Sequence, residues 1–88
     1  MLDFKKYVND EDDLEFIQDL YEELAISQSP VCLSCRGYRF QIDPCGGGAE
    51  IWHLGQMVGF FKTIDDLFLH FQIDGKPFIE QVSDIYYE

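Results

Sequence analysis

The chain has 88 residues, too few for two hydrophobic cores, so we expect residues 1–88 to form one domain. Hydrophobic residues make up 47% of the chain, which supplies an ordinary core and argues against intrinsic disorder. Its 17 acids and 6 bases give a formal net charge of −11. So few bases cannot build the basic patch of a nucleic-acid binder, and an anionic membrane would repel the chain; we expect neither direct nucleic-acid binding nor a membrane partner.

The number of cysteines and the first residues of the chain indicate the cellular compartment of the protein. Three cysteines are an odd number, whereas a secreted domain usually carries an even set. The opening residues MLDFKKYVNDEDD contain no apolar segment typical of a signal peptide, and no apolar run approaches the roughly 18 residues of a membrane span. These features favour a cytoplasmic protein with reduced thiols.

A first helix is predicted to begin after Asn9 or Asp10 and to run to about Ile26. Acidic residues crowd its first turn, where the helix dipole favours them, and Pro30 lies just beyond its end. At about 100° per residue, one face of the helix collects the apolar side chains Leu14, Ile17, Leu20, Tyr21 and Leu24.

Four short strands are expected to follow as an antiparallel meander, over residues 31–35, 38–43, 49–54 and 57–61. The second is the clearest, because apolar and polar side chains alternate along it. The glycine-rich segment 44–48 is typical of a hairpin connection, and Gly55-Gln56 of a two-residue turn. Trp52 falls on the opposite strand face from Ile51, where we expect it to be exposed.

The C-terminal part is predicted to be helical. Thr63 and Asp66 form a start that resembles a capping box, and the helix that they open should end near residues 73–75. In the main interpretation Pro77 opens a last helix with the apolar face Phe78, Ile79, Val82, Ile85 and Tyr86. In the alternative, Asp74-Gly75 is a hairpin turn between two strands.

The predicted fold class is therefore α+β. It combines an antiparallel meander of three or four strands with an N-terminal helix and one or two C-terminal helices. The helices are expected to pack as one layer on one face of the sheet, because this arrangement buries all the apolar faces named above.

Cys32, Cys35, Cys45 and His53 follow the spacing C-x2-C-x9-C-x7-H, and a small metal-binding domain is the alternative functional interpretation. A structural zinc site usually has two close pairs of ligands, whereas Cys45 and His53 are well separated. If residues 31–35 form a strand, Cys32 and Cys35 also point to opposite faces and cannot bind one metal ion. We therefore expect no bound metal, no disulfide and no cofactor.

Catalytic motifs are missing from the sequence: it has no G-x-S-x-G, P-loop, G-x-G-x-x-G or H-E-x-x-H pattern. Asp65 and Asp66 are adjacent and so do not face each other as a catalytic carboxylate pair would; helix capping explains both. We expect a protein that is not an enzyme.

The first helix carries eight acids and no base between Asp10 and Glu23. Like charges three or four residues apart destabilise a helix, and an ordinary solvated face would mix in lysines. Phe16 lies beside these acids, and aromatic anchors are common at protein interfaces. Five of the acids fall within an arc of about 100°, which we call the acidic face: Asp12, Glu15, Asp19, Glu22 and Glu23.

These features predict a non-catalytic interaction module or inhibitor. It would present the acidic face, with Phe16 at its edge, to an unidentified protein with a basic surface, for instance as a mimic of nucleic-acid phosphate. In size, acidity and order of elements the chain is similar to some phage-encoded inhibitors of nucleic-acid enzymes, although it shares no motif with them. The alternative explanation of the acidic face is solubility.

Overall fold

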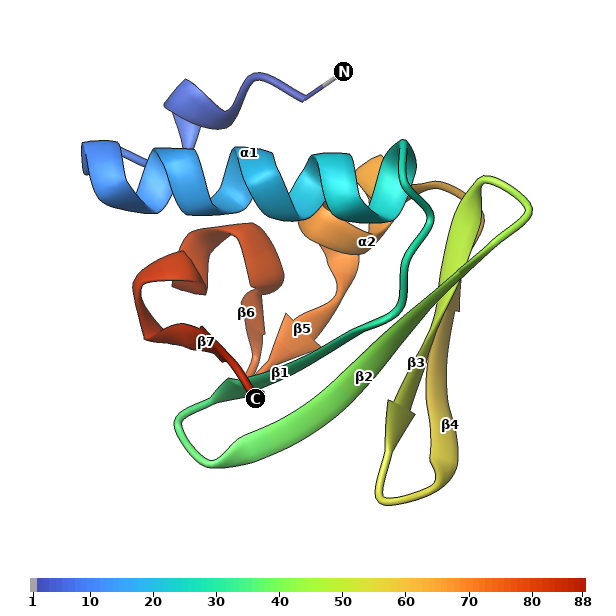
Figure 1. Cartoon of the computed structure of the whole chain (residues 1–88). Coiled ribbons are helices and arrows are strands. Elements are labelled where there is room, and N and C mark those ends of the chain that lie inside the picture. Colours follow the sequence, from blue (N-terminus) through green and yellow to red (C-terminus); the bar gives the residue numbers. More distant parts are fainter. Residues whose placement is uncertain (1) are drawn as a thin grey trace.

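A five-stranded antiparallel sheet with helices on one face organises the chain, which is α+β as predicted (Figure 1). The computed structural model describes residues 2–88. The strand order in the sheet is β4-β3-β2-β1-β7. In chain order the elements are the 3₁₀ helix η1 (Phe4–Lys6), α1 (Glu11–Ala25), β1 (Val31–Cys35), β2 (Tyr38–Cys45), β3 (Gly48–His53), β4 (Gln56–Phe61), α2 (Ile64–His70), β5 (Gln72–Ile73), β6 (Lys76–Pro77), the 3₁₀ helix η2 (Phe78–Asp84) and β7 (Ile85–Tyr87).

Helix α1 forms where the sequence predicts it. The Asp10 side chain caps its N-terminus by accepting hydrogen bonds from the backbone N–H groups of Asp12 (2.9 Å) and Asp13 (3.1 Å). The helical period places its fully buried side chains on one stripe, which consists of Ile17, Leu20 and Leu24.

Strands β1 to β4 form the predicted meander, each pairing antiparallel with the next. One turn differs from the prediction. His53 pairs with Gln56, so the turn residues between β3 and β4 are Leu54 and Gly55 rather than Gly55 and Gln56. Both have positive φ, 50° and 80°, as in a type I′ turn, whose twist matches that of the flanking strands.

Helix α2 is shorter than predicted. The Thr63 side chain accepts a hydrogen bond from the backbone N–H of Asp66 (3.0 Å), which confirms the start, but the helix ends at His70 instead of near residues 73–75. The following residues form a small hairpin, β5–β6, around Asp74-Gly75, with φ angles of 55° and 79°. The alternative interpretation of this segment is therefore correct, because Asp-Gly suits the left-handed positions of a tight turn.

The predicted last α-helix is wrong. Phe78–Asp84 form the 3₁₀ helix η2, which is kinked at Gln81 (φ −116°, ψ 18°), and the residues after it form β7. β7 pairs with β1, so Ile85 is buried and Tyr86 is exposed, as strand alternation requires. A strand this short shows no periodicity of its own, and its formation depends on pairing with a strand far earlier in the chain.

Helices cover one face of the sheet, and the other face is open (Figure 1). Helices α1, α2 and η2 each contact strands of the sheet. Together with apolar side chains from these helices, one face of the central strands forms the core through Val31, Leu33, Cys35, Phe40, Ile42, Ala49 and Ile51. Among residues 2–88, no helix has both the length and the apolar character that a membrane crossing needs.

Candidate functional site

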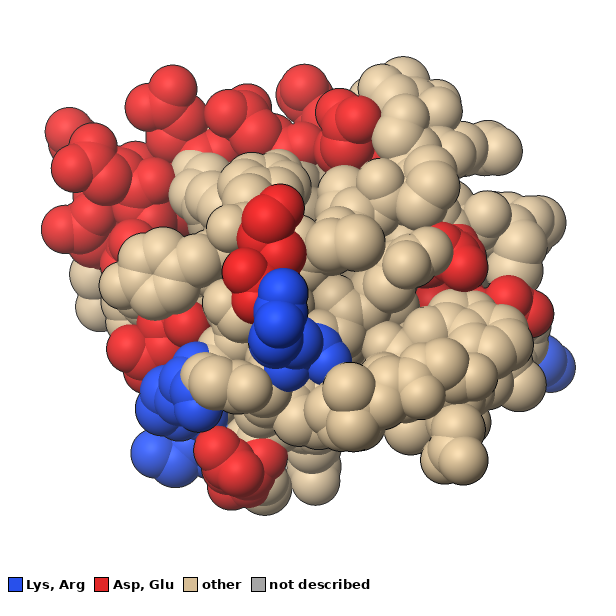
Figure 2. Space-filling view, turned by 60° about the horizontal axis from the view of Figure 1, so that its bottom comes forward, with Lys and Arg blue, Asp and Glu red and all other residues tan. Residues whose placement is uncertain are grey.

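The acidic face of α1 is open to solvent along most of its length. Asp12, Glu15, Asp19 and Glu22 are exposed, and Glu23 is half-buried. The helical period that buries the apolar stripe turns these side chains outwards. Figure 2 shows acidic side chains gathered along the upper left margin of the molecule.

Within residues 2–88, no base forms an ion pair with the acidic face. Arg36 pairs with Asp74 (3.2 Å) and Asp84 (2.8 Å), and Arg39 pairs with Glu88 (2.8 Å). Both arginines are therefore committed to acids outside α1. The mutual repulsion along the acidic face is left without a neutralising partner in this part of the chain.

Negative charge also accumulates at the N-terminal end of α1. Burial raises the pKa of Asp13, and the charges of Asp10, Asp12 and Asp84 raise it further. Asp84 belongs to η2, so the fold brings a distant acid towards the start of the helix. The acidic character of this side of the molecule thus extends beyond the acidic face itself.

Phe16 lies beside the acidic face and is half-buried, so it belongs partly to the fold. Its ring packs edge-on against Tyr87 of β7, with 5.4 Å between the ring centroids. Burial raises the pKa of Tyr87, and the charges of Glu23 and Asp19 raise it further. This aromatic pair joins α1 to β7, and only the remaining exposed part of the Phe16 ring is available to a partner.

The structure does not bring together the four residues of the alternative metal site. β1 places Cys32 on the open face and Cys35 in the core, as strand parity predicts. Cys45 is exposed at the end of β2, and His53 stacks on Tyr38 with 4.3 Å between the ring centroids. In the part of the chain that the structure describes, no three potential metal ligands cluster.

The three thiols should differ sharply in reactivity. Cys32 and Cys45 are exposed, whereas Cys35 is buried, and this burial raises the pKa of its thiol. We expect a disulfide reagent to label Cys32 and Cys45 quickly in the native protein, and Cys35 only on unfolding. Absorbance of the released thiol measures this, with Cys35→Ala as the control that keeps both fast thiols. Rapid labelling of all three would contradict the placement of Cys35.

A small cavity of about 240 Å³ lies where the end of α1, the β2–β3 turn and the start of α2 meet. Beside it, the Tyr21 hydroxyl donates a hydrogen bond to Oδ1 of Asp65 at 2.5 Å. Burial raises the pKa of Tyr21 to about 12, and the hydrogen bond to Asp65 and its charge contribute. Tyr21 is therefore protonated at neutral pH, where it links the two helices.

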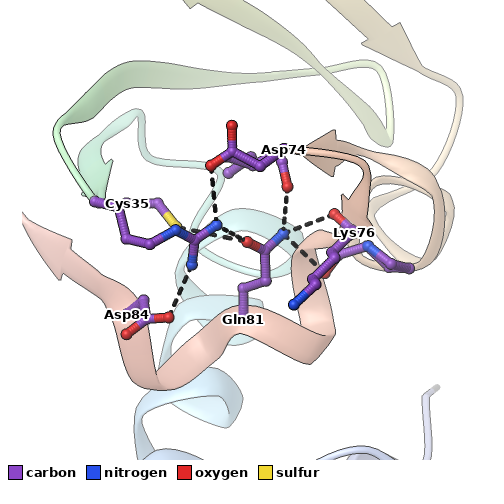
Figure 3. A network of polar contacts seen from close by, with 8 residues as sticks. Cys35, Asp74, Lys76, Gln81 and Asp84 are labelled. Atoms are coloured by element: carbon purple, nitrogen blue, oxygen red, sulfur yellow. Dashed lines mark hydrogen bonds and ion pairs between the residues drawn. The ribbon is translucent and has the colours of Figure 1, made fainter.

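A polar network that the sequence does not reveal centres on Gln81, a buried side chain of η2 (Figure 3). Its Nε2 donates to the backbone carbonyl oxygens of Ile73 (2.9 Å) and Lys76 (2.7 Å), and its Oε1 accepts from Arg36. Sγ of Cys35 lies 3.9 Å from the same Oε1. The network fastens the β5–β6 hairpin to η2 and to the turn after β1, so its role is to hold the fold together.

The open face of the sheet carries a groove of about 510 Å³, which no sequence motif predicts. Trp52 lines this groove and is half-buried rather than exposed, and its Nε1 donates to Oε1 of Glu50 at 3.3 Å. Arg39 and Glu88, which form an ion pair, line it as well. From the sequence, only the alternation of side chains along the strands indicates which residues lie on this face. That alternation does not predict the depth or the shape of the groove.

Comparisons of the chain with protein-family models, curated proteins and solved structures find no match.

Proposed function

We propose that this protein is a non-catalytic interaction module or inhibitor that presents the acidic face of α1 to a basic surface on a partner protein. One observation carries the proposal: the carboxylates of the acidic face have no cationic partner within residues 2–88. Like charges at these helical spacings cost stability, and solubility alone needs no such one-sided row. A basic partner would convert the repulsion into attraction and would speed association.

The length of the acidic face suits a partner that normally binds nucleic acid. At about 1.5 Å per residue, the helix rises by about 16 Å from Asp12 to Glu23. Measured along the duplex axis, five successive phosphates of one DNA strand rise by a similar length of about 14 Å, at about 3.4 Å each. Lysines and arginines arranged for a row of phosphates would therefore meet a comparable row of carboxylates.

Neutralising two acids of this face should slow binding without harming the fold. In the double variant Glu15→Gln with Glu22→Gln, the free energy of unfolding should stay unchanged or rise by about 0.2–0.5 kcal/mol per relieved like-charge pair. Association with the basic partner should become slower, most of all at low salt, where screening is weak. Urea unfolding measures the first quantity, and surface plasmon resonance measures the association rate.

The partner for this measurement is the protein that the immobilised chain captures from a lysate of its source cells at low salt and releases at high salt. As a matched control, Asp3→Asn with Glu80→Gln removes two exposed acids outside α1 and should keep the native association rate. Competition by duplex DNA for the captured protein tests the mimicry.

An unchanged association rate of the α1 variant would mean that the acidic face serves solubility alone. A stability loss above about 1 kcal/mol would mean that the acids serve the fold.

A further inference from the structure

The edge strand β4 is unprotected. It forms one end of the sheet, and no strand within residues 2–88 pairs with its outer edge. Edge strands are usually guarded by charged residues, proline or a covering element. β4 contains no charged residue and no proline, and its side chains Met57, Val58 and Phe60 are 52%, 49% and 54% exposed. Unpaired backbone groups flanked by apolar side chains are therefore open to another strand.

The opposite edge of the sheet is protected in the usual way. β7 is only three residues long, and acids lie on both sides of it, Asp84 before and Glu88 after. Each acid also holds an arginine by an ion pair, Arg36 and Arg39 respectively. A short strand with charges at both ends is a poor template for pairing. β4 is longer, with six residues, and has a charge at one end only, Lys62 after Phe61, so its middle residues are left without such protection.

A β-bulge shapes β4 without guarding it. Met57 pairs with Trp52 and Gly59 pairs with Ile51, so Val58 has no partner on β3 and is the extra residue of the bulge. The bulge thus adds an apolar side chain to the edge instead of a charge. It also places Met57 and Phe60, the partners of Trp52 and Glu50 on β3, on the same open face of the sheet.

We propose that β4 pairs with β4 of a second copy of this chain, antiparallel about a two-fold axis, so that one continuous sheet crosses a homodimer. Because the two strands run in opposite directions, Met57 of each copy can lie beside Phe60 of the other on the open face. A thioether beside an aromatic ring is a favourable contact. A two-fold contact is self-complementary, so a single bare edge supplies both halves of the interface.

The charge distribution selects a second copy over a basic or an acidic partner. β4 offers no carboxylate to a basic protein and no base to an acidic one, whereas an uncharged apolar edge fits another of the same kind. The acidic face lies on α1, which runs along the top of Figure 1, while the β3–β4 turn lies at the bottom right. The dimer therefore leaves both acidic faces free and does not depend on the function proposed above.

Net charge gives this dimer a characteristic salt dependence. Two chains with a charge of −11 each repel one another. Raising the salt from about 0.1 M to about 1 M shortens the screening length from about 10 Å to about 3 Å. Salt should therefore strengthen the dimer, whereas it should weaken a complex between the acidic face and a basic protein. The opposite responses distinguish the two interfaces.

Sedimentation equilibrium of the purified full chain, at about 0.1 M and about 1 M salt, tests the proposal. The average mass should approach that of two chains as the concentration rises through the micromolar range, and it should do so earlier at high salt. Val58→Lys and Phe60→Lys should each raise the Kd of the dimer by about tenfold or more, because each puts a lysine from both copies into the seam. Circular dichroism checks that each variant folds, and two variants guard against the failure of one.

Ile26→Lys is the matched control, because it adds the same charge at an apolar residue that is 74% exposed and lies outside the sheet. It should leave the dimer intact. A wild-type mass of one chain under all conditions would overturn the proposal. Equal weakening of the dimer by Ile26→Lys and by the two edge variants would do the same, as would weaker self-association at high salt.

Discussion

Replacing Phe78 by alanine should lower the free energy of unfolding by about 3–5 kcal/mol, the range for truncating a fully buried phenylalanine. The Phe78 side chain has no exposed surface, and three other rings surround it. Its ring centroid lies 5.3 Å from that of Phe68, 6.1 Å from that of Phe40 and 6.1 Å from that of Phe71. These rings come from α2, from the sheet and from the segment after α2, so no single element can move to fill the cavity.

A graded pair of variants separates a cavity from a general loss of apolar surface. Phe78→Leu keeps much of the side-chain volume and should cost only about 1–1.5 kcal/mol. Urea unfolding followed by the fluorescence of Trp52, which is the only tryptophan, gives both values. Because a small domain is stabilised by only about 5–15 kcal/mol, Phe78→Ala should shift the unfolding midpoint strongly. Equal small costs for the two variants would contradict the tight ring packing.

The elements that the sequence predicts correctly are those with local causes. Helix α1 has its cap at Asp10, a clear apolar stripe and Pro30 beyond its end, all within one segment of chain. The meander follows from alternation in β2 and from glycine-containing turns between neighbouring strands. Each of these signals acts over a few residues. Tertiary packing is compatible with them and does not change the local structure that they predict.

The errors lie at the C-terminus, where distant contacts decide the structure. Phe78, Ile79 and Val82 are all buried, and their spacing suits an α-helix as well as the kinked 3₁₀ helix that forms. The kink coincides with Gln81, whose hydrogen-bond partners lie in other elements. Likewise, Ile85, Tyr86 and Tyr87 are residue types that favour strands, but three residues are too few to predict one without the edge that β1 offers.

The candidate site is predictable from the sequence only where local geometry decides it. The exposure of the acidic face follows from helical geometry alone. Its lack of ion pairs does not, because Arg36 and Arg39 find their acids in residues far along the chain. A four-stranded meander would leave both β1 and β4 as edges. The sequence therefore offers two candidate edges, and only the pairing of β7 with β1 covers one of them and leaves β4 as the long unpaired edge of this sheet.

Gln81→Leu should lower the free energy of unfolding by about 3 kcal/mol, because it leaves several polar groups without their partner. Gln81 is 3% exposed, and its amide satisfies the backbone carbonyls of Ile73 and Lys76 while its Oε1 accepts from Arg36 (Figure 3). Loss of the donor costs about 1–3 kcal/mol at the buried carbonyl of Ile73 and less at the part-buried carbonyl of Lys76, and leucine restores part of this through its apolar surface. Urea unfolding measures the total.

The part of the structure that Gln81→Leu destabilises distinguishes the role of this network from ordinary core packing. With the Gln81 amide gone, the β5–β6 hairpin loses its attachment to η2, so its amide protons should exchange faster while those of α1 keep their relative protection. Gln72→Leu is the matched control, since it makes the same substitution at an exposed glutamine in β5 and should cost little. If both leucine variants have the same small cost, water replaces the amide of Gln81 and the network does not stabilise the fold. If the exchange of α1 and of the hairpin accelerates equally, Gln81 supports the whole core and not the attachment of the hairpin.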